Sequence, residues 1–190
     1  MPKLWNDTIE SHRKDVRDAI FEAAAALAAE RGLTSVTMSS IAERAGITRA
    51  TLYKYFSDAD VILRGWQERQ VERNLAELVA ARDRASDAEQ RLVLMLETYA
   101  RLVHQQHASE LVALLHHSAS ASRGYRQLTE MLRDLIADGA NRGRLRKDVS
   151  PVELASFCVH ALSGAHTLPS MAAVRRLVSV TISGLKPPRT

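Results

Sequence analysis

The residues best suited to chemistry gather in one short stretch near the N-terminus. Between positions 44 and 57 there is no acidic residue, and that stretch supplies the cationic, hydroxyl and phenol side chains of Arg49, Thr51, Tyr53, Lys54 and Tyr55. Cations and phenols bind phosphate oxygens, whereas a threonine offers a hydroxyl to base edges and a methyl group to thymine. The stretch therefore indicates binding to a nucleic acid.

Two short helices are predicted to position these side chains. Thr37 is a suitable N-cap for the first helix, and Gly46 is well placed to end it because glycine adopts the left-handed conformation at little cost. Thr48 can cap the second helix, which is predicted to run from Arg49 to Phe56. Two short helices joined by a tight turn predict a helix-turn-helix.

The second helix has one side for packing and one for DNA. Leu52 and Phe56 are four residues apart and are predicted to face the apolar residues of the first helix, which are Ile41, Ala42 and Ala45. The opposite side presents Ala50, Thr51, Tyr53 and Lys54 to the major groove. The alternative is that both tyrosines pack on the helix and Thr51 is an ordinary surface residue. The agreement of several local signals favours DNA binding.

The run from Ile41 to Phe56, together with the preceding 33–37, resembles the TetR family of regulators, down to its Leu-Tyr-x-x-Phe ending. This resemblance implies three N-terminal helices that bind DNA and a fourth that links them to a body for ligand binding and dimerisation. It implies DNA contacts from Thr37, Ser39, Thr48, Arg49, Ala50, Thr51, Tyr53, Lys54 and Tyr55. The family often has a basic residue within 57–60, where this chain has Ser-Asp-Ala-Asp, and often has His at the position of Tyr55.

The rest of the chain is predicted to be helical as well, which makes the fold class all-α. Residues 1–11 show no periodicity and are expected to be a loose lead-in to a helix over 13–31. Longer helices are expected over 58–82, from 87 onward, around 111–115, and over 124–141, 151–168 and 171–185, with a basic connector at 143–150. We expect a DNA-binding domain at 1–57 and a helical ligand-binding and dimerisation domain at 58–190.

A ligand site in this body would be mostly apolar. The expected lining residues are Trp66, Met95, Tyr99, Val103, Leu111, Leu114, Leu128 and Met131, although residues of this kind at helical spacing belong to the core more often than to a ligand site. His104, His107, His116 and His117 are close in sequence, but histidines more often make ordinary hydrogen bonds than bind a metal, so no metal and no cofactor are expected.

The last two helices are predicted to pair with those of a second copy, because DNA with two half-sites requires two recognition helices. The expected dimer interface consists of Leu154, Cys158, Ala161, Leu162, Ala165, Val174, Leu177, Val178 and Ile182. A single cysteine excludes an internal disulfide, and we interpret Cys158 as a small buried hydrophobe.

Composition limits the remaining classes of function. The chain has 190 residues and a formal charge of +4, and no segment resembles a signal peptide or a membrane span, so a cytoplasmic location and no membrane partner are expected. No nucleotide-binding, hydrolase or zinc-protease motif is present, which argues against an enzyme. The preferred hypothesis is a homodimeric repressor that a small-molecule effector releases from double-stranded operator DNA. The alternative is an architectural DNA-binding protein without an effector.

Overall fold

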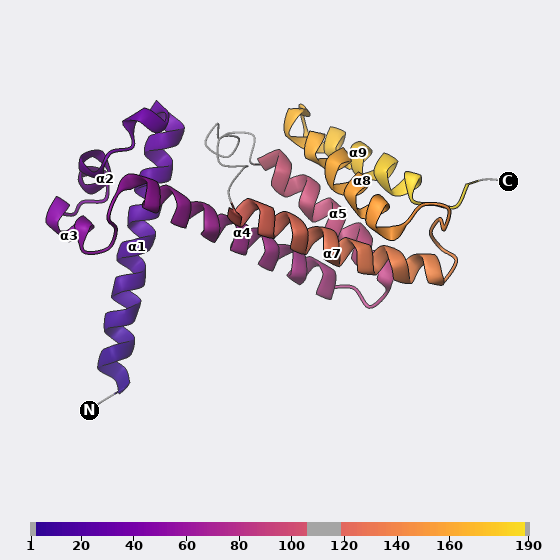
Figure 1. The fold of residues 1–190 in the computed structure, drawn as a ribbon, viewed down its shortest axis with the longest axis horizontal. Coiled ribbons are helices and arrows are strands. Elements are labelled where there is room, and N and C mark those ends of the chain that lie inside the picture. The colour runs from indigo at the N-terminus through magenta and orange to yellow at the C-terminus, as the bar shows by residue number, and fades with distance from the viewer. Residues whose placement is uncertain (1–2, 106–118, 189–190) are drawn as a thin grey trace. The chain divides into compact units, whose positions relative to one another are not determined.

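The computed structural model describes residues 3–105 and 119–188, and the side chains of 11–105 and 122–188. Helices make up the regular structure of these residues, with no strand among them, which confirms the predicted all-α class (Figure 1). The described residues divide into two compact units, which meet within helix α4 (Ala59–Asp83) between Gln70 and Val71. The predicted helix around 111–115 lies outside the described residues.

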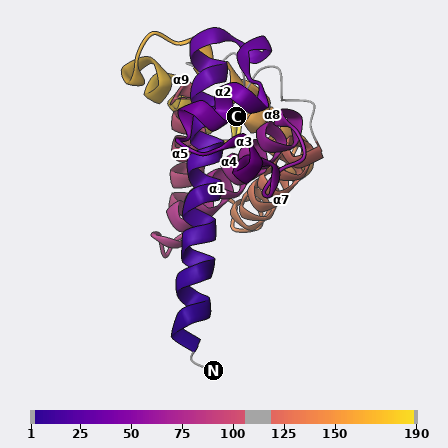
Figure 2. The ribbon, with the colours of Figure 1, turned by 90° about the vertical axis from the view of Figure 1, so that its left-hand side faces the viewer.

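The first unit contains α1 (Lys3–Arg31), a 3-10 turn η1 (Leu33–Ser35), α2 (Met38–Arg44), α3 (Arg49–Tyr53) and the first part of α4. The expectation of a loose lead-in was wrong, because α1 begins at Lys3 and is one continuous helix in both views (Figures 1 and 2). Apolar periodicity marks only a helix that buries one side, so its absence in the sequence did not exclude a helix here.

The core of the first unit joins all of its helices. Its fully buried side chains include Ile20 and Ala24 of α1, Ile41 of α2, Leu52 of α3 and Ile62 of α4. Phe21 and Phe56 also lie in this core, with ring centroids 5.3 Å apart and the rings tilted by 54°. Contacts from every helix on one cluster fix the position of the short α2 and α3, which could not form stable helices alone.

The second unit contains the rest of α4, α5 (Ala88–Gln105), α7 (Ala119–Asn141), α8 (Pro151–Ser163), η3 (Gly164–Thr167) and α9 (Met171–Gly184). The α7 helix starts five residues before the predicted Gly124. The predicted helix over 151–168 ends at Ser163 and continues as the 3-10 turn. The core of this unit includes Leu96, Leu132, Ile136, Leu162 and Leu185, all without exposed surface.

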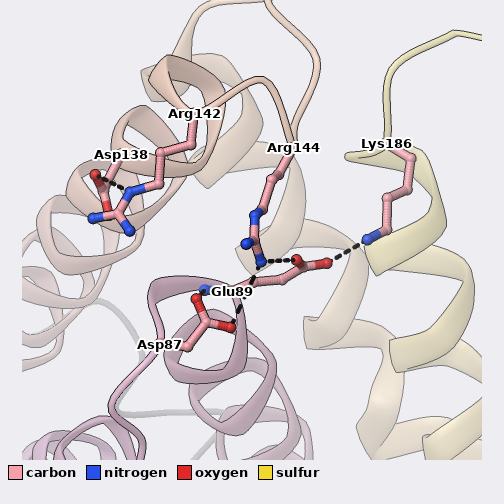
Figure 3. A network of polar contacts seen from close by, with 6 residues as sticks. All are labelled: Asp87, Glu89, Asp138, Arg142, Arg144 and Lys186. Carbon is pink, nitrogen blue, oxygen red and sulfur yellow. Dashed lines mark hydrogen bonds and ion pairs between the residues drawn. The ribbon is translucent and has the colours of Figure 1, made fainter.

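One end of the second unit is held together by charged residues (Figure 3). The carboxylate of Glu89, in the first turn of α5, accepts hydrogen bonds from Lys186 just after α9 and from Arg144 in the connector after α7. Arg146 of the same connector donates from its backbone N–H to the carbonyl of Leu185 at 2.9 Å and from its side chain to that of Gly184 at 3.1 Å. The connector thereby ties the ends of three helices to one another.

Candidate DNA-binding site

The start of α2 is fixed by a reciprocal cap. The backbone N–H of Ser40 donates to the hydroxyl of Thr37 at 3.1 Å, and the N–H of Thr37 donates to the hydroxyl of Ser40 at 3.0 Å. The two residues form a capping box, so the predicted N-cap is confirmed. Thr37 and Ser39 are both exposed. The orphan N–H groups of this helix end are partly satisfied within the protein, and both hydroxyls remain open to solvent.

The turn between α2 and α3 depends on Gly46. Its φ is 68°, in the left-handed region, and the following N–H of Ile47 donates to the carbonyl of Ala42 at 3.0 Å. This geometry is the predicted helix stop, and it turns the chain within three residues towards the cap of the next helix. Thr48 then accepts the N–H of Thr51 at 3.1 Å, and the two threonine hydroxyls lie 2.9 Å apart.

The two sides of α3 differ as predicted. Leu52 has no exposed surface and Phe56 is nearly buried, both in the core of the first unit. The exposed residues on or next to the helix are Thr48, Arg49, Ala50, Tyr53 and Lys54. Tyr53 exposes 49% of its surface, which is unusual for a large aromatic residue. This exposed side is therefore open to a partner.

Three predicted features differ in detail from the structure. The α3 helix ends at Tyr53 instead of Phe56, and the N–H groups of Tyr55 and Phe56 both close onto the carbonyl of Leu52, at 2.9 and 3.1 Å. Thr51 and Tyr55 are only partly exposed, and Tyr55 also packs against the core. A shorter helix with a tightened end brings the phenol of Tyr55 back towards the protein.

The positive charge of this region is smaller than the sequence suggests. Arg44 belongs to the acid-free stretch, but both of its terminal nitrogens donate to the carboxylate of Glu30 on α1, each at 2.6 Å. The hydrogen bonds from this guanidinium lower the pKa of Glu30. Arg49 and Lys54 then remain as the cations of the stretch. Sequence alone missed Glu30 because it is 14 residues away.

The segment after α3 serves as a helix cap. Asp58 accepts the backbone N–H of Val61 at 2.8 Å and the hydroxyl of Ser57 at 2.9 Å. These hydrogen bonds, the backbone one first, lower the pKa of the Asp58 carboxyl. The acidic residue that departs from the family pattern thus caps the start of α4.

Comparison with known proteins decides the identity of the chain. The family model described as "Bacterial regulatory proteins, tetR family" matches residues 20–64. The model described as "Transcriptional regulator SbtR-like, C-terminal domain" matches residues 90–187, which is about half of the chain. The chain belongs to the TetR family of transcriptional regulators. The predicted resemblance is confirmed, and the helix-turn-helix of this TetR-family protein is its DNA-binding element.

Solved structures share the fold of this TetR-family chain at low sequence identity. A regulator of the TetR/AcrR family from Thermobifida fusca is 22% identical with a TM-score of 0.78, over 90% of this chain and 98% of that one. The transcriptional regulator FadR from Bacillus subtilis, solved with stearoyl-CoA, is 17% identical with a TM-score of 0.72, over 88% and 98% of the two chains.

Curated relatives match a shorter region. An uncharacterized HTH-type transcriptional regulator of Mycobacterium tuberculosis, MT1294, is 29% identical over 103 residues, which are 54% of this chain and 51% of that protein. The chain thus spans about half the length of the curated relatives it matches.

The predicted ligand-lining residues fall into different parts of this TetR-family protein. Met95, Tyr99, Val103, Leu128 and Met131 all belong to or pack against the core of the second unit. Trp66 instead packs against the core of the first unit. The remaining two, Leu111 and Leu114, lie outside the described residues, as do His107, His116 and His117. His104 is described, and its Nδ1 lies 3.1 Å from the carbonyl oxygen of Ala165.

The residues predicted for the dimer interface differ in how deeply they are buried within their own chain. Six of them are buried within their own chain, where they form the core of the second unit: Leu154, Cys158, Leu162, Ala165, Val174 and Val178. Ala161, Leu177 and Ile182 are partly exposed. The apolar stripe of an amphipathic helix first packs inside the monomer, so the sequence pattern identified the inner faces of α8 and α9. Burial also raises the pKa of the Cys158 thiol to about 12, which keeps it unreactive.

Proposed function

We propose that this regulator is a homodimeric repressor whose α3 helix reads operator DNA and whose helical body binds a small-molecule effector. The observation that carries the proposal is the exposed side of α3, where Arg49, Tyr53 and Lys54 stand beside a helix fixed by its cap and its buried Leu52. A rigid helix with small and polar exposed residues suits the major groove. A protein that binds operator DNA acts in the cytoplasm of a bacterium.

Hydroxyl groups on and next to α3 have different roles in this proposal. The N-cap Thr48 accepts the N–H of Thr51 and fixes the first turn, and the hydroxyls of the two threonines lie within hydrogen-bond distance of each other. Tyr53 carries the most exposed ring and is placed to bond a phosphate or a base edge. Thr37 and Ser39, exposed at the start of α2, supply phosphate contacts on the other side of the groove.

Dimerisation is proposed for the outer faces of α8 and α9. Phe157 of α8 exposes 46% of its surface, and Val152 and Val180 expose 56% and 68%. The ring of Phe157 lies over Gly184 of α9, within 3.6 Å of the position that a Cβ would take there. Exposed large apolar side chains on two adjacent helices support an interface between copies.

The effector is proposed to enter the helical body beside Tyr99. Burial raises the pKa of Tyr99 to about 12, so its phenol stays protonated and acts as a donor. Neighbouring side chains are apolar, including Met95, Leu128 and Met131. A ligand with an apolar chain and one acceptor group fits this combination, and the Bacillus subtilis regulator with stearoyl-CoA supports acyl thioesters as the first compounds to test.

The decisive experiment is selection of bound duplexes from a random DNA pool, followed by gel shifts on the winning site. We expect a palindromic site, and Tyr53→Ala to weaken its binding by about ten- to a hundredfold, since a base or phosphate contact contributes about 1–3 kcal/mol. Thr34→Ala, which alters an exposed threonine of η1, is the control and should bind normally. A pool without enrichment would instead support a sequence-independent architectural protein.

The dimer and the effector are tested on the selected site. Phe157→Asp should turn a dimer into a monomer in sedimentation, whereas Ala76→Asp adds the same charge to an exposed position of α4 and should leave the dimer intact. Acyl-CoA thioesters of several chain lengths should release the DNA, and Tyr99→Phe should weaken that release. A chain that stays dimeric as Phe157→Asp contradicts the proposed interface.

A further inference from the structure

Arg17 of α1 holds an exposed guanidinium beside the end of the recognition segment. Its Cζ lies 5.4 Å from the centroid of the Phe56 ring, within the range of a cation–π contact. Phe56 is itself held by the core, where its ring meets that of Phe21. A flexible side chain such as arginine is therefore held in one region by a rigid aromatic surface.

The charge of Arg17 is not neutralised by the described side chains. The adjacent Asp18 points its carboxylate to another residue, since both terminal nitrogens of Arg69 on α4 donate to it. Within residues 11–105 and 122–188 no ion pair or hydrogen bond engages the Arg17 guanidinium. Arg44 and Arg69, by contrast, are each paired with a carboxylate. Among the described side chains of this unit, Arg17 therefore has no carboxylate partner, unlike Arg44 and Arg69.

Stacking leaves the chemistry of this guanidinium intact. A cation–π contact uses the flat face of the group, whereas its five N–H donors lie in the plane and point outward. A planar fork of donors fits the oxygens of a phosphate in a bidentate way. An exposed guanidinium that lies over the Phe56 ring, and that no described carboxylate engages, therefore keeps its donors available for an anion.

The position of Arg17 suggests which anion that is. Phe56 ends the recognition segment, one turn after the exposed Tyr53 and Lys54. The chain that follows, 57–60, has no basic residue, and its Asp58 is used as a helix cap. A DNA phosphate next to this end of the recognition segment would therefore be contacted by Arg17 of α1 and not by a basic residue at the start of α4.

We propose that Arg17 contacts a backbone phosphate of the operator next to the half-site read by α3. The contact is independent of base sequence and adds affinity, and it positions the recognition helix without specifying bases. The inference rests on the proposed DNA-reading function of α3. Its chemical partner is a single phosphodiester of double-stranded DNA on each protomer.

Salt dependence measures such a contact directly. Each neutralised phosphate contributes about 0.9 to the slope of log affinity against log salt concentration, so Arg17→Gln should reduce the slope by about 0.9 for each protomer bound. Its affinity should fall by a similar factor for the selected duplex and for a scrambled one. Arg17→Lys keeps the charge and should restore the slope, whereas a guanidinium that only packs on Phe56 would change stability and leave the slope unchanged.

Arg175→Gln is the matched control, because it removes an exposed arginine from α9 in the other unit, where no described residue pairs with it. It should leave the slope unchanged. Thermal unfolding by circular dichroism checks that each variant is folded. An equal fall of the slope in both arginine variants would attribute the effect to total charge and overturn the inference, as would an unchanged slope in Arg17→Gln.

A second measurement locates the phosphate. Methylphosphonates, which are neutral, are introduced one at a time along the selected duplex. At one position in each half-site, a methylphosphonate should weaken DNA binding by the wild-type protein. It should not weaken binding by Arg17→Gln, because that variant already lacks the cation that contacts this phosphate. Equal weakening of both proteins at every position would overturn the contact. Failure to select any duplex would instead contradict the proposed function itself.

Discussion

The two units of this protein are built from the same kind of helix but place their functional residues differently. In the first unit, the exposed residues proposed to read DNA lie within eight consecutive positions, 48–55, fixed by caps at Thr37 and Thr48. In the second, Tyr99 packs against a core cluster whose residues come from α4, α5, α7, α8 and α9, brought together only by packing. A site carried on one short helix is readable from local sequence, whereas a site assembled from several helices is not.

Helix caps and ion pairs differ in how much sequence they span. The caps of α2 and α3 span three residues each, although Arg44 of α2 also pairs with Glu30, 14 residues away. In the second unit the contact between Lys186 and Glu89 spans 97 residues. Local contacts fix the angle of a helix start, while distant ones fix the ends of separate helices relative to one another. Changes in the first unit should therefore act on DNA binding, and changes in the second on the helical body.

The largest loss of stability is expected when one fully buried leucine is truncated in each core. Leu52→Ala and Leu96→Ala each remove a side chain without exposed surface, which costs about 2–5 kcal/mol of the free energy of unfolding. Hydrogen exchange read by segment should show faster exchange in α2 and α3 for the first variant and in α5 and α7 for the second. Accelerated exchange throughout the chain in either variant would contradict two separate cores.

A smaller loss of stability is expected when alanine replaces one glycine in each unit. Gly46 in the first unit has a φ of 68°, and no atom lies within 4 Å of the position that a Cβ would take there. Gly46→Ala should therefore cost about 1–2 kcal/mol through backbone strain alone. In the second unit a Cβ on Gly124 would lie 2.7 Å from Cγ1 of Val71, so Gly124→Ala should cost about 1–3 kcal/mol through crowding.

A second substitution separates the two causes. Val71→Ala makes room beside position 124 and should recover much of the stability lost in Gly124→Ala, measured by urea unfolding of the double variant. No neighbouring substitution can relieve Gly46→Ala, because its cost lies in the backbone. Equal losses with and without Val71→Ala would show that crowding is not the cause at Gly124.

The helix-turn-helix could be predicted from sequence because its signals are local. Thr37, Gly46 and Thr48 mark helix ends within a dozen residues, and the structure confirms all three. The length of α3 was overestimated because its last residues close onto Leu52 in a tighter turn that apolar spacing does not reveal. The ion pairs of Arg44 and Arg69 could not be predicted, since their partners are 14 and 51 residues away.

In the second unit, apolar periodicity did not reveal which residues pack against each helix. The stripe through Leu154, Cys158 and Leu162 was interpreted as a dimer interface, but it is the inner face that packs within the monomer. The outer face carries Phe157, whose single position does not make a stripe. Trp66 was assigned to the body although its packing partners are in the first unit. Apolar periodicity shows which face of a helix is buried. Only the folded structure shows which residues bury that face.

The smallest effect is expected from Glu89, which links α5 to the ends of α7 and α9 (Figure 3). Hydrogen bonding from Lys186, and next from Arg144, lowers the pKa of Glu89 below its ordinary value of 4.5. A carboxyl whose pKa is lowered by folding stabilises the folded protein above its unfolded pKa, and this contribution disappears as the pH falls through the lowered pKa. The group is partly exposed, so the expected contribution is below about 1 kcal/mol.

Glu89→Gln should therefore lower the unfolding temperature slightly at pH 7 and at low salt, because the charge attraction is lost. The difference from the wild type should shrink as the pH falls from 4.5 through the lowered pKa of Glu89, below which the folded wild-type carboxyl is neutral as well. Glu97→Gln, at an exposed position of the same helix α5, controls for the removal of one negative charge. Because Glu89 joins helix ends of the second unit only, hydrogen exchange in α2 and α3 should be the same in Glu89→Gln as in the wild type. Faster exchange there would mean that charge contacts in the body also stabilise the DNA-binding helices.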